Sequence, residues 1–113
     1  MTSPTVSPDV FFACDLRVGT VLSCELNAKA RESAYVMSID FGPEIGARRS
    51  SAQLTDVYKP EDLVGRQVVA VVNFPAKNVA GVESQCLVLG LHTEAGVVLL
   101  AVERPVPNGS RVS

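Results

Sequence analysis

The chain has 113 residues, which is enough for one hydrophobic core and too few for two. It is 47% hydrophobic, with 10 basic and 12 acidic side chains and a formal net charge of −2. No apolar run approaches the roughly 20 residues of a membrane helix, and residues 1–13 lack the pattern of a secretory signal. We therefore expect a cytoplasmic protein without membrane insertion.

The residue types that support catalysis or metal binding are scarce and scattered. Cys14, Cys24 and Cys86 are odd in number and widely spaced, which argues against a disulfide framework and against a paired-cysteine metal site. The single histidine, His92, lies in an apolar segment without a nearby nucleophile. The sequence predicts no enzyme, no metal and no cofactor.

The first residues predict an arm followed by a short helix. Residues 1–8 contain Ser, Thr and two prolines and are expected to be a flexible arm, with a single domain over residues 9–113. Pro8 suits the first helical turn, with Ser7 as its cap, and the helix is expected to end near Cys14. Its apolar side chains, at positions 10–12, exceed what so short a helix can bury. They are expected to cover an end of the domain or, as we favour, to contact a second subunit.

Two alternating segments come next. Residues 16–26 predict a long half-buried strand, in which Gly19 suggests a bulge or a sharp bend. The alternation assigns one set of side chains to the core: Leu16, Val18, Thr20, Leu22, Cys24 and Leu26. Residues 34–41 predict a second strand with Tyr35, Met37, Ile39 and Phe41 on one face. The connector between them, residues 27–33, is polar and reads as a solvated turn, in which Lys29 and Arg31 are possible borders of a ligand groove.

Residues 44–54 form a third extended segment that is poor in large apolar side chains. Its centre carries Arg48 and Arg49 followed by two serines, so we expect its side chains to have a role other than filling the hydrophobic core. Residues 60–65 then predict a single helical turn, because proline comes first, carboxylates follow and glycine ends the run.

Two apolar runs, residues 68–74 and 86–91, flank a polar insert at residues 75–85. We interpret the runs as strands buried on both sides and the insert as the working surface of the protein. The alternative is an ordinary polar turn between two core strands. Residues 97–102 add another extended piece, and residues 104–113 predict an irregular tail. Five or six short strands with one helical turn indicate a small closed all-β domain.

The order of these motifs resembles a known family. The runs at residues 73–77 (NFPAK) and 81–85 (GVESQ), followed by an apolar strand, resemble the tRNA-binding oligonucleotide/oligosaccharide-binding (OB) domain, which occurs alone or appended to tRNA synthetases. Residues 15–20, 39–42, 50–55 and 89–91 extend the likeness to the CsaA branch of that family. The resemblance implies a five-stranded Greek-key OB barrel, with a short helix between strands three and four and a short N-terminal helix.

The resemblance also implies a function. A CsaA-like member is expected to be a non-catalytic homodimer that binds tRNA. Carried over by motif, Asn73, Lys77, Ser84 and Gln85 would position the RNA, with Asn78 and Cys86 in the same stretch. Arg48 and Arg49 are added on charge, because residues 47–81 carry a net charge of +2 whereas residues 1–46 carry −3. With no tryptophan and few aromatics, recognition of folded tRNA by shape is favoured over reading of single bases.

A second function from a different class is binding of unfolded or secretory polypeptides, the chaperone role associated with the CsaA branch. Surplus apolar surface motivates it. The residues assigned to this peptide or dimer surface are Val10, Phe11, Phe12, Val97 and Val98. Alternatively, the same residues are buried in the core of a dimer interface.

Overall fold

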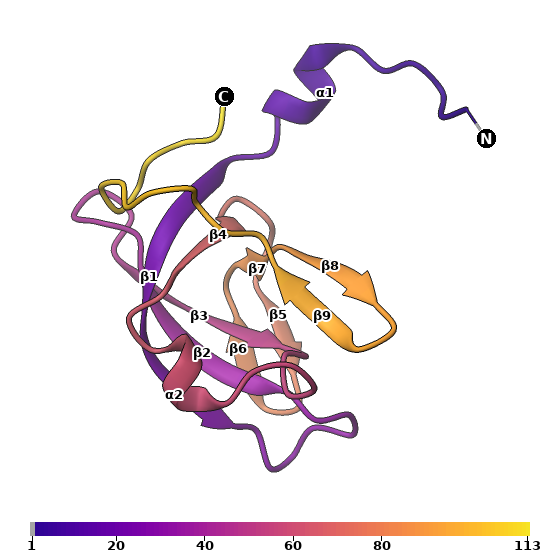
Figure 1. Cartoon of the computed structure of the whole chain (residues 1–113). Helices are drawn as coiled ribbons and strands as arrows, with labels where there is room; N and C mark the ends of the chain where they lie inside the picture. The colour runs from indigo at the N-terminus through magenta and orange to yellow at the C-terminus, as the bar shows by residue number, and fades with distance from the viewer. Residues whose placement is uncertain (1) are drawn as a thin grey trace.

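Five antiparallel strands curl into a nearly closed barrel in the computed structural model, which describes residues 2–113 (Figure 1). The strands lie in the order β3-β2-β1-β4-β7. Their bounds are Leu16–Leu26 for β1, Tyr35–Asp40 for β2, Ala47–Ala52 for β3, Gln67–Val71 for β4 and Leu87–Val88 for β7. This order and closure confirm the predicted OB barrel.

Two short helices and two hairpins complete the structure. Helix α1 spans Pro8–Phe12 and helix α2 spans Pro60–Leu63, between β3 and β4 as predicted. The polar insert folds into a hairpin of β5 (Lys77–Val79) and β6 (Val82–Ser84), and a second hairpin pairs β8 (Gly90–Thr93) with β9 (Gly96–Leu99). In Figure 1 the second hairpin extends from the side of the barrel.

The core has two parts because β4 is buried on both faces. The barrel interior holds Met37, Ile39, Phe41, Leu63 and Val68, each fully buried. A smaller cluster on the outer face joins two residues of β1 to two of β4: Leu16, Val18, Val69 and Val71. The C-terminal tail covers this second cluster, and its backbone bonds to β1 from Val112 N–H to Leu16 O at 2.9 Å and from Gly109 N–H to Val18 O at 2.7 Å.

The prediction of a doubly buried strand was wrong for residues 86–91. Strand β7 ends at Val88, and after Leu89 the chain leaves the barrel to pair with β9. Leu87 is 49% exposed and Leu91 is 54% exposed. Leu91 is exposed because the second hairpin, which carries it, extends from the side of the barrel (Figure 1).

The predicted inward face of β1 was wrong in its second half. The register with β2 shifts between Val21 and Ser23, which marks a β-bulge. Leu16 and Val18 pack in the outer cluster, whereas Val21 packs in the barrel interior. After the bulge Cys24 packs against that interior, while Leu22 is 52% exposed and Leu26 61% exposed. Gly19 is not the bulge. A Cβ atom there would lie 2.6 Å from Ile39 Cγ2, so Gly19 is required by close packing against β2.

Helix α1 lies outside the barrel. It ends at Phe12, two residues before the predicted end, and Ser7 takes the N-cap position without a side-chain hydrogen bond. The helix has no buried residue, and Val10, Phe11 and Phe12 are about half exposed or more. Covering the end of the barrel is therefore not the role of these side chains. Neither helix in the part of the chain that the structure describes is long and apolar enough to cross a membrane.

Candidate nucleic-acid interface

The hairpin β5–β6 is the centre of the candidate site. Its turn places Ala80 at φ 49° and Gly81 at φ 84°, two successive left-handed residues that give the tight reversal typical of short hairpins. Asn78 stabilises the turn, because its Oδ1 accepts a hydrogen bond from the Gly81 N–H at 3.1 Å. Lys77 and Ser84 are register partners across the hairpin.

The hairpin docks on the edge of β3 and closes the barrel there. Gln85 N–H donates to the Arg49 carbonyl oxygen at 2.7 Å, and Arg49 N–H donates to Gln85 Oε1 at 2.9 Å. One residue pair along, Ser51 N–H donates to Ser84 Oγ at 3.1 Å. These bonds bring Arg49, Lys77, Ser84 and Gln85 into one neighbourhood, as the charge argument requires.

The connector between β1 and β2 lies across from the hairpin. It is closed on itself, because Asn27 N–H donates to Ala34 O at 2.9 Å and Asn27 Oδ1 accepts from Lys29 N–H at 3.1 Å. Lys29 and Arg31 border a cavity of about 650 Å³ between the connector, the hairpin turn and the end of β3. These two residues therefore border a cavity, and its use by a ligand stays a prediction.

We call this region the hairpin face and define it by seven residues from three segments: Lys29, Arg31, Arg49, Ser51, Gln53, Lys77 and Ser84. The sequence analysis did not identify Ser51 and Gln53 as residues of the candidate site. They follow Arg49 at every second position, and this period along β3 could have identified them as members of the same outer face. Ser51 also borders a smaller cavity of about 250 Å³, beside Phe74 and Lys77.

The cations of the hairpin face are exposed and unpaired. Within residues 2–113, the side chains of Lys29, Arg31, Arg49 and Lys77 make no hydrogen bond or ion pair. The other arginines all have protein partners: Arg17, Arg48, Arg66, Arg104 and Arg111. Acidic side chains are also near, with Glu32 at the cavity and Glu83 on β6. The face can therefore offer several free cations to phosphates from a rigid base.

Residues 16–111 match the model of a family described as "Putative tRNA binding domain". The chain belongs to this family. Its fold is shared with the chaperone CsaA from Bacillus anthracis str. Ames, at 48% identity and a TM-score of 0.90, over 97% of this chain and 100% of that one. The CsaA chaperone protein from Picrophilus torridus gives 38% identity and a TM-score of 0.91, over 96% of this chain and 100% of the other.

Methionine–tRNA ligases are also relatives. The ligase of Methanothrix thermoacetophila is 40% identical over 106 residues, which are 94% of this chain but 15% of the ligase. The chain thus spans about a seventh of the length of these curated relatives. Together with the CsaA structures, these matches confirm the CsaA-like resemblance within the tRNA-binding domain family.

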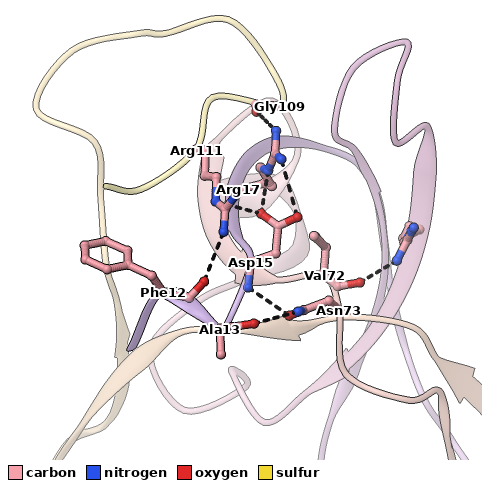
Figure 2. A network of polar contacts seen from close by, with 9 residues as sticks. Phe12, Ala13, Asp15, Arg17, Val72, Asn73, Gly109 and Arg111 are labelled. Atoms are coloured by element: carbon pink, nitrogen blue, oxygen red, sulfur yellow. Dashed lines mark hydrogen bonds and ion pairs between the residues drawn. The ribbon is translucent and has the colours of Figure 1, made fainter. Parts of the chain in front are cut away.

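Three of the residues predicted to bind RNA are bonded to the backbone of the protein or buried within it. Arg48 Nη1 donates to the Val72 carbonyl oxygen at 2.6 Å. Asn73 accepts from Asp15 N–H at 2.8 Å and donates to the Ala13 carbonyl oxygen at 2.9 Å (Figure 2). Cys86 is buried, and this burial raises the pKa of its thiol to about 11. A contact of these three side chains with RNA stays a prediction.

The bonds of Asn73 belong to a polar network that fixes the start of the barrel. Arg17 Nε lies 2.6 Å and Arg111 Nε 3.4 Å from Asp15 Oδ1, and Arg111 also donates to the Phe12 carbonyl oxygen at 3.1 Å (Figure 2). The hydrogen bond from Arg17 lowers the pKa of Asp15 below its ordinary value of 3.8. The network ties α1, β1 and the C-terminal tail together, away from the hairpin face.

Proposed function

We propose that this chain is a non-catalytic, cytoplasmic tRNA-binding protein that recognises folded tRNA by shape and backbone contacts through the hairpin face. The observation that carries the proposal is the gathering of four unpaired cations, Lys29, Arg31, Arg49 and Lys77, around one polar surface of a rigid barrel. Phosphate neutralisation by such groups supplies most of the affinity for a polyanion, even when the whole molecule is acidic.

The aromatic side chains favour shape over stacking on successive bases. Tyr35 is buried, and the hydroxyl of Tyr58 accepts a hydrogen bond from Leu99 N–H at 3.0 Å. Phe74, 46% exposed, is the aromatic residue that borders the hairpin face. Recognition of folded RNA relies on phosphate and 2′-hydroxyl contacts, which the lysines, arginines and serines of the face can make.

The proposed molecule is a homodimer in which the exposed side chains of α1, Val10, Phe11 and Phe12, contact the second subunit. Two hairpin faces in one particle would raise the effective concentration of the second RNA contact. Val97 and Val98 are less suited to this surface, because both are half-buried and Val97 packs against the barrel core.

The test is tRNA binding measured by fluorescence anisotropy as a function of salt. The Arg49→Ala, Lys77→Ala double variant should lose about tenfold in affinity at about 50 mM salt and should lower the slope of log K against log salt by about two. The matched control is the Arg66→Ala, Arg104→Ala double variant, which removes the same charge from a separate depression on the molecule. This control should bind tRNA like the native protein.

Two results would count against the proposal. The native protein would show no tRNA binding at about 50 mM salt, or both double variants would lose the same affinity. The second result would mean that net charge, and not the hairpin face, governs binding.

A second candidate function is binding of unfolded polypeptide. The observation that favours it is the exposed apolar surface of α1, with Phe11 46% and Phe12 45% exposed and their rings in edge-to-face contact at 5.2 Å. An exposed apolar patch of this kind is typical of an interaction site. In addition, two similar solved structures are chaperone CsaA proteins.

This second function predicts that the native protein slows aggregation of a heat-unfolded client, measured by light scattering. The Phe11→Ser, Phe12→Ser double variant should lose most of the effect. The Leu22→Ser, Leu26→Ser double variant, which removes similarly exposed apolar side chains from β1, should keep it. If the client aggregates at the same rate with and without native protein, the peptide-binding function is excluded.

A further inference from the structure

The cavity between the connector and the hairpin turn combines features that the shape-based proposal does not use. It encloses about 650 Å³, within the range of small-molecule sites and ample for one nucleotide. Its walls come from three segments that are far apart in the sequence: the connector, the end of β3 and the hairpin turn. Lys29 Cδ lies 3.9 Å from where a Cβ on Gly81 would stand, so the Lys29 side chain extends close to the hairpin turn.

A hydrogen-bonded pair of polar side chains marks one wall of this cavity. Gln53 Nε2 donates to Glu32 Oε2 at 2.7 Å, which fixes both side chains although both are exposed. Within residues 2–113, Glu32 Oε1 and Gln53 Oε1 have no donor of their own. Both residues line the cavity, so the pair contributes oxygen acceptors to its wall; both also border a second depression, with Ser33, Thr55 and Asp56.

The remaining walls suit the other parts of a nucleotide. Ala34, Val79 and Ala80 form an apolar surface for the flat face of a base. Lys29 and Arg31 are unpaired cations at the same cavity, placed to neutralise a phosphate and to offset the charge of Glu32. The bonds at Asn27 fix the backbone of the connector that carries these two cations before any ligand arrives.

We propose that this cavity binds one unstacked nucleotide whose base carries an exocyclic amino group, with Glu32 and Gln53 as the specificity-determining residues. Carboxylate and amide oxygens accept hydrogen bonds from the exocyclic amino groups of cytosine and adenine, whereas uracil has a carbonyl oxygen at the position of the cytosine amino group. The inference rests on the proposed function, because its biological ligand would be an unpaired nucleotide of a folded tRNA. It adds a base-reading site to a surface otherwise assigned to backbone contacts.

The test uses cytidine 5′-monophosphate and uridine 5′-monophosphate as probes, since they share size, sugar and phosphate and differ at the base edge. Amide shifts of the ¹⁵N-labelled full chain should move at Gln53, Val79 and Ala80. The cytidine nucleotide should bind about five- to tenfold more tightly than the uridine nucleotide. Glu32→Gln should bring this ratio close to one. The matched control Glu83→Gln, on β6 and outside the cavity, should leave it unchanged.

The outcomes separate this inference from the proposed function. Equal affinities for the two nucleotides in the native protein, or shifts outside the cavity, would overturn the nucleotide site even if tRNA binds with the expected salt slope. Cytidine-selective shifts in a protein that does not bind tRNA would support the nucleotide site and reject the proposed function. Unchanged selectivity in Glu32→Gln, with a native-like amide spectrum, would overturn the assignment of Glu32.

Discussion

Polar residues in a loop are ambiguous when only their type is known, because the groups that recognise a ligand also satisfy backbone atoms. Ser84 lies on the hairpin face and Gln85 follows it, yet the side-chain oxygens of both accept bonds from the backbone of β3. Asn73 shows the opposite case, because its amide is used on the far side, between Ala13 and Asp15. The sequence alone could not distinguish the protein partners of these side chains from an RNA partner.

Asn73→Ala separates the two roles of this side chain. Because the change removes two hydrogen bonds that hold the start of β1, we expect the free energy of unfolding to fall by about 1 kcal/mol. A purely structural role of Asn73 predicts an unchanged affinity for tRNA. Chemical denaturation and anisotropy measured on the same sample would check both points. A loss of tRNA affinity at unchanged stability would show instead that Asn73 contacts the RNA.

At the scale of elements, the hairpin β5–β6 determines the geometry of the site. Its turn uses Ala80 at φ 49°, although a non-glycine residue with a side chain that cannot bond locally is disfavoured there. Asn followed by Gly is the preferred pair for such a turn. The chain therefore keeps a small strain at the hairpin tip, which borders the same cavity as the connector.

Ala80→Asn should relieve this strain. We expect a gain of about 0.5 to 1 kcal/mol in stability, seen as a higher midpoint of thermal unfolding. Ala76→Asn is the matched control, because Ala76 is equally exposed in the same insert and has no positive φ. The control should leave the free energy of unfolding within about 0.5 kcal/mol of the native value. A gain of the same size in both variants would show that the turn conformation is not its cause.

At the scale of the whole molecule, the barrel is joined at a seam between the ends of its sheet. The hydrogen bonds from β3 to Ser84 and Gln85 close this seam, and Cys86 lies beneath it with its Sγ 3.7 Å from the Arg49 carbonyl oxygen. Burial raises the pKa of this thiol from 9.0 to about 11. The folded state therefore favours the neutral thiol more than the unfolded chain does.

This difference predicts a loss of stability in alkaline solution. The contribution of Cys86 should be fully present below about pH 9 and should disappear as the pH rises toward 11, because the unfolded chain releases the proton first. We expect a loss on the order of 1–2 kcal/mol over this range. Urea titrations of native protein and Cys86→Ala at several pH values would measure it. The difference between the two proteins should change with pH, and a constant difference would contradict the prediction.

Local pattern alone determined most of the elements. Alternation predicted β1 and β2, the order of Pro60, carboxylates and glycine predicted α2, and the motifs around the polar insert indicated the family, because each of these signals lies within a few residues. Only the tertiary structure decided the bulge in β1, the partners of Arg48 and Asn73, and the meeting of Lys29 with the hairpin turn. Those features depend on pairing between segments far apart in the chain, which no local periodicity encodes.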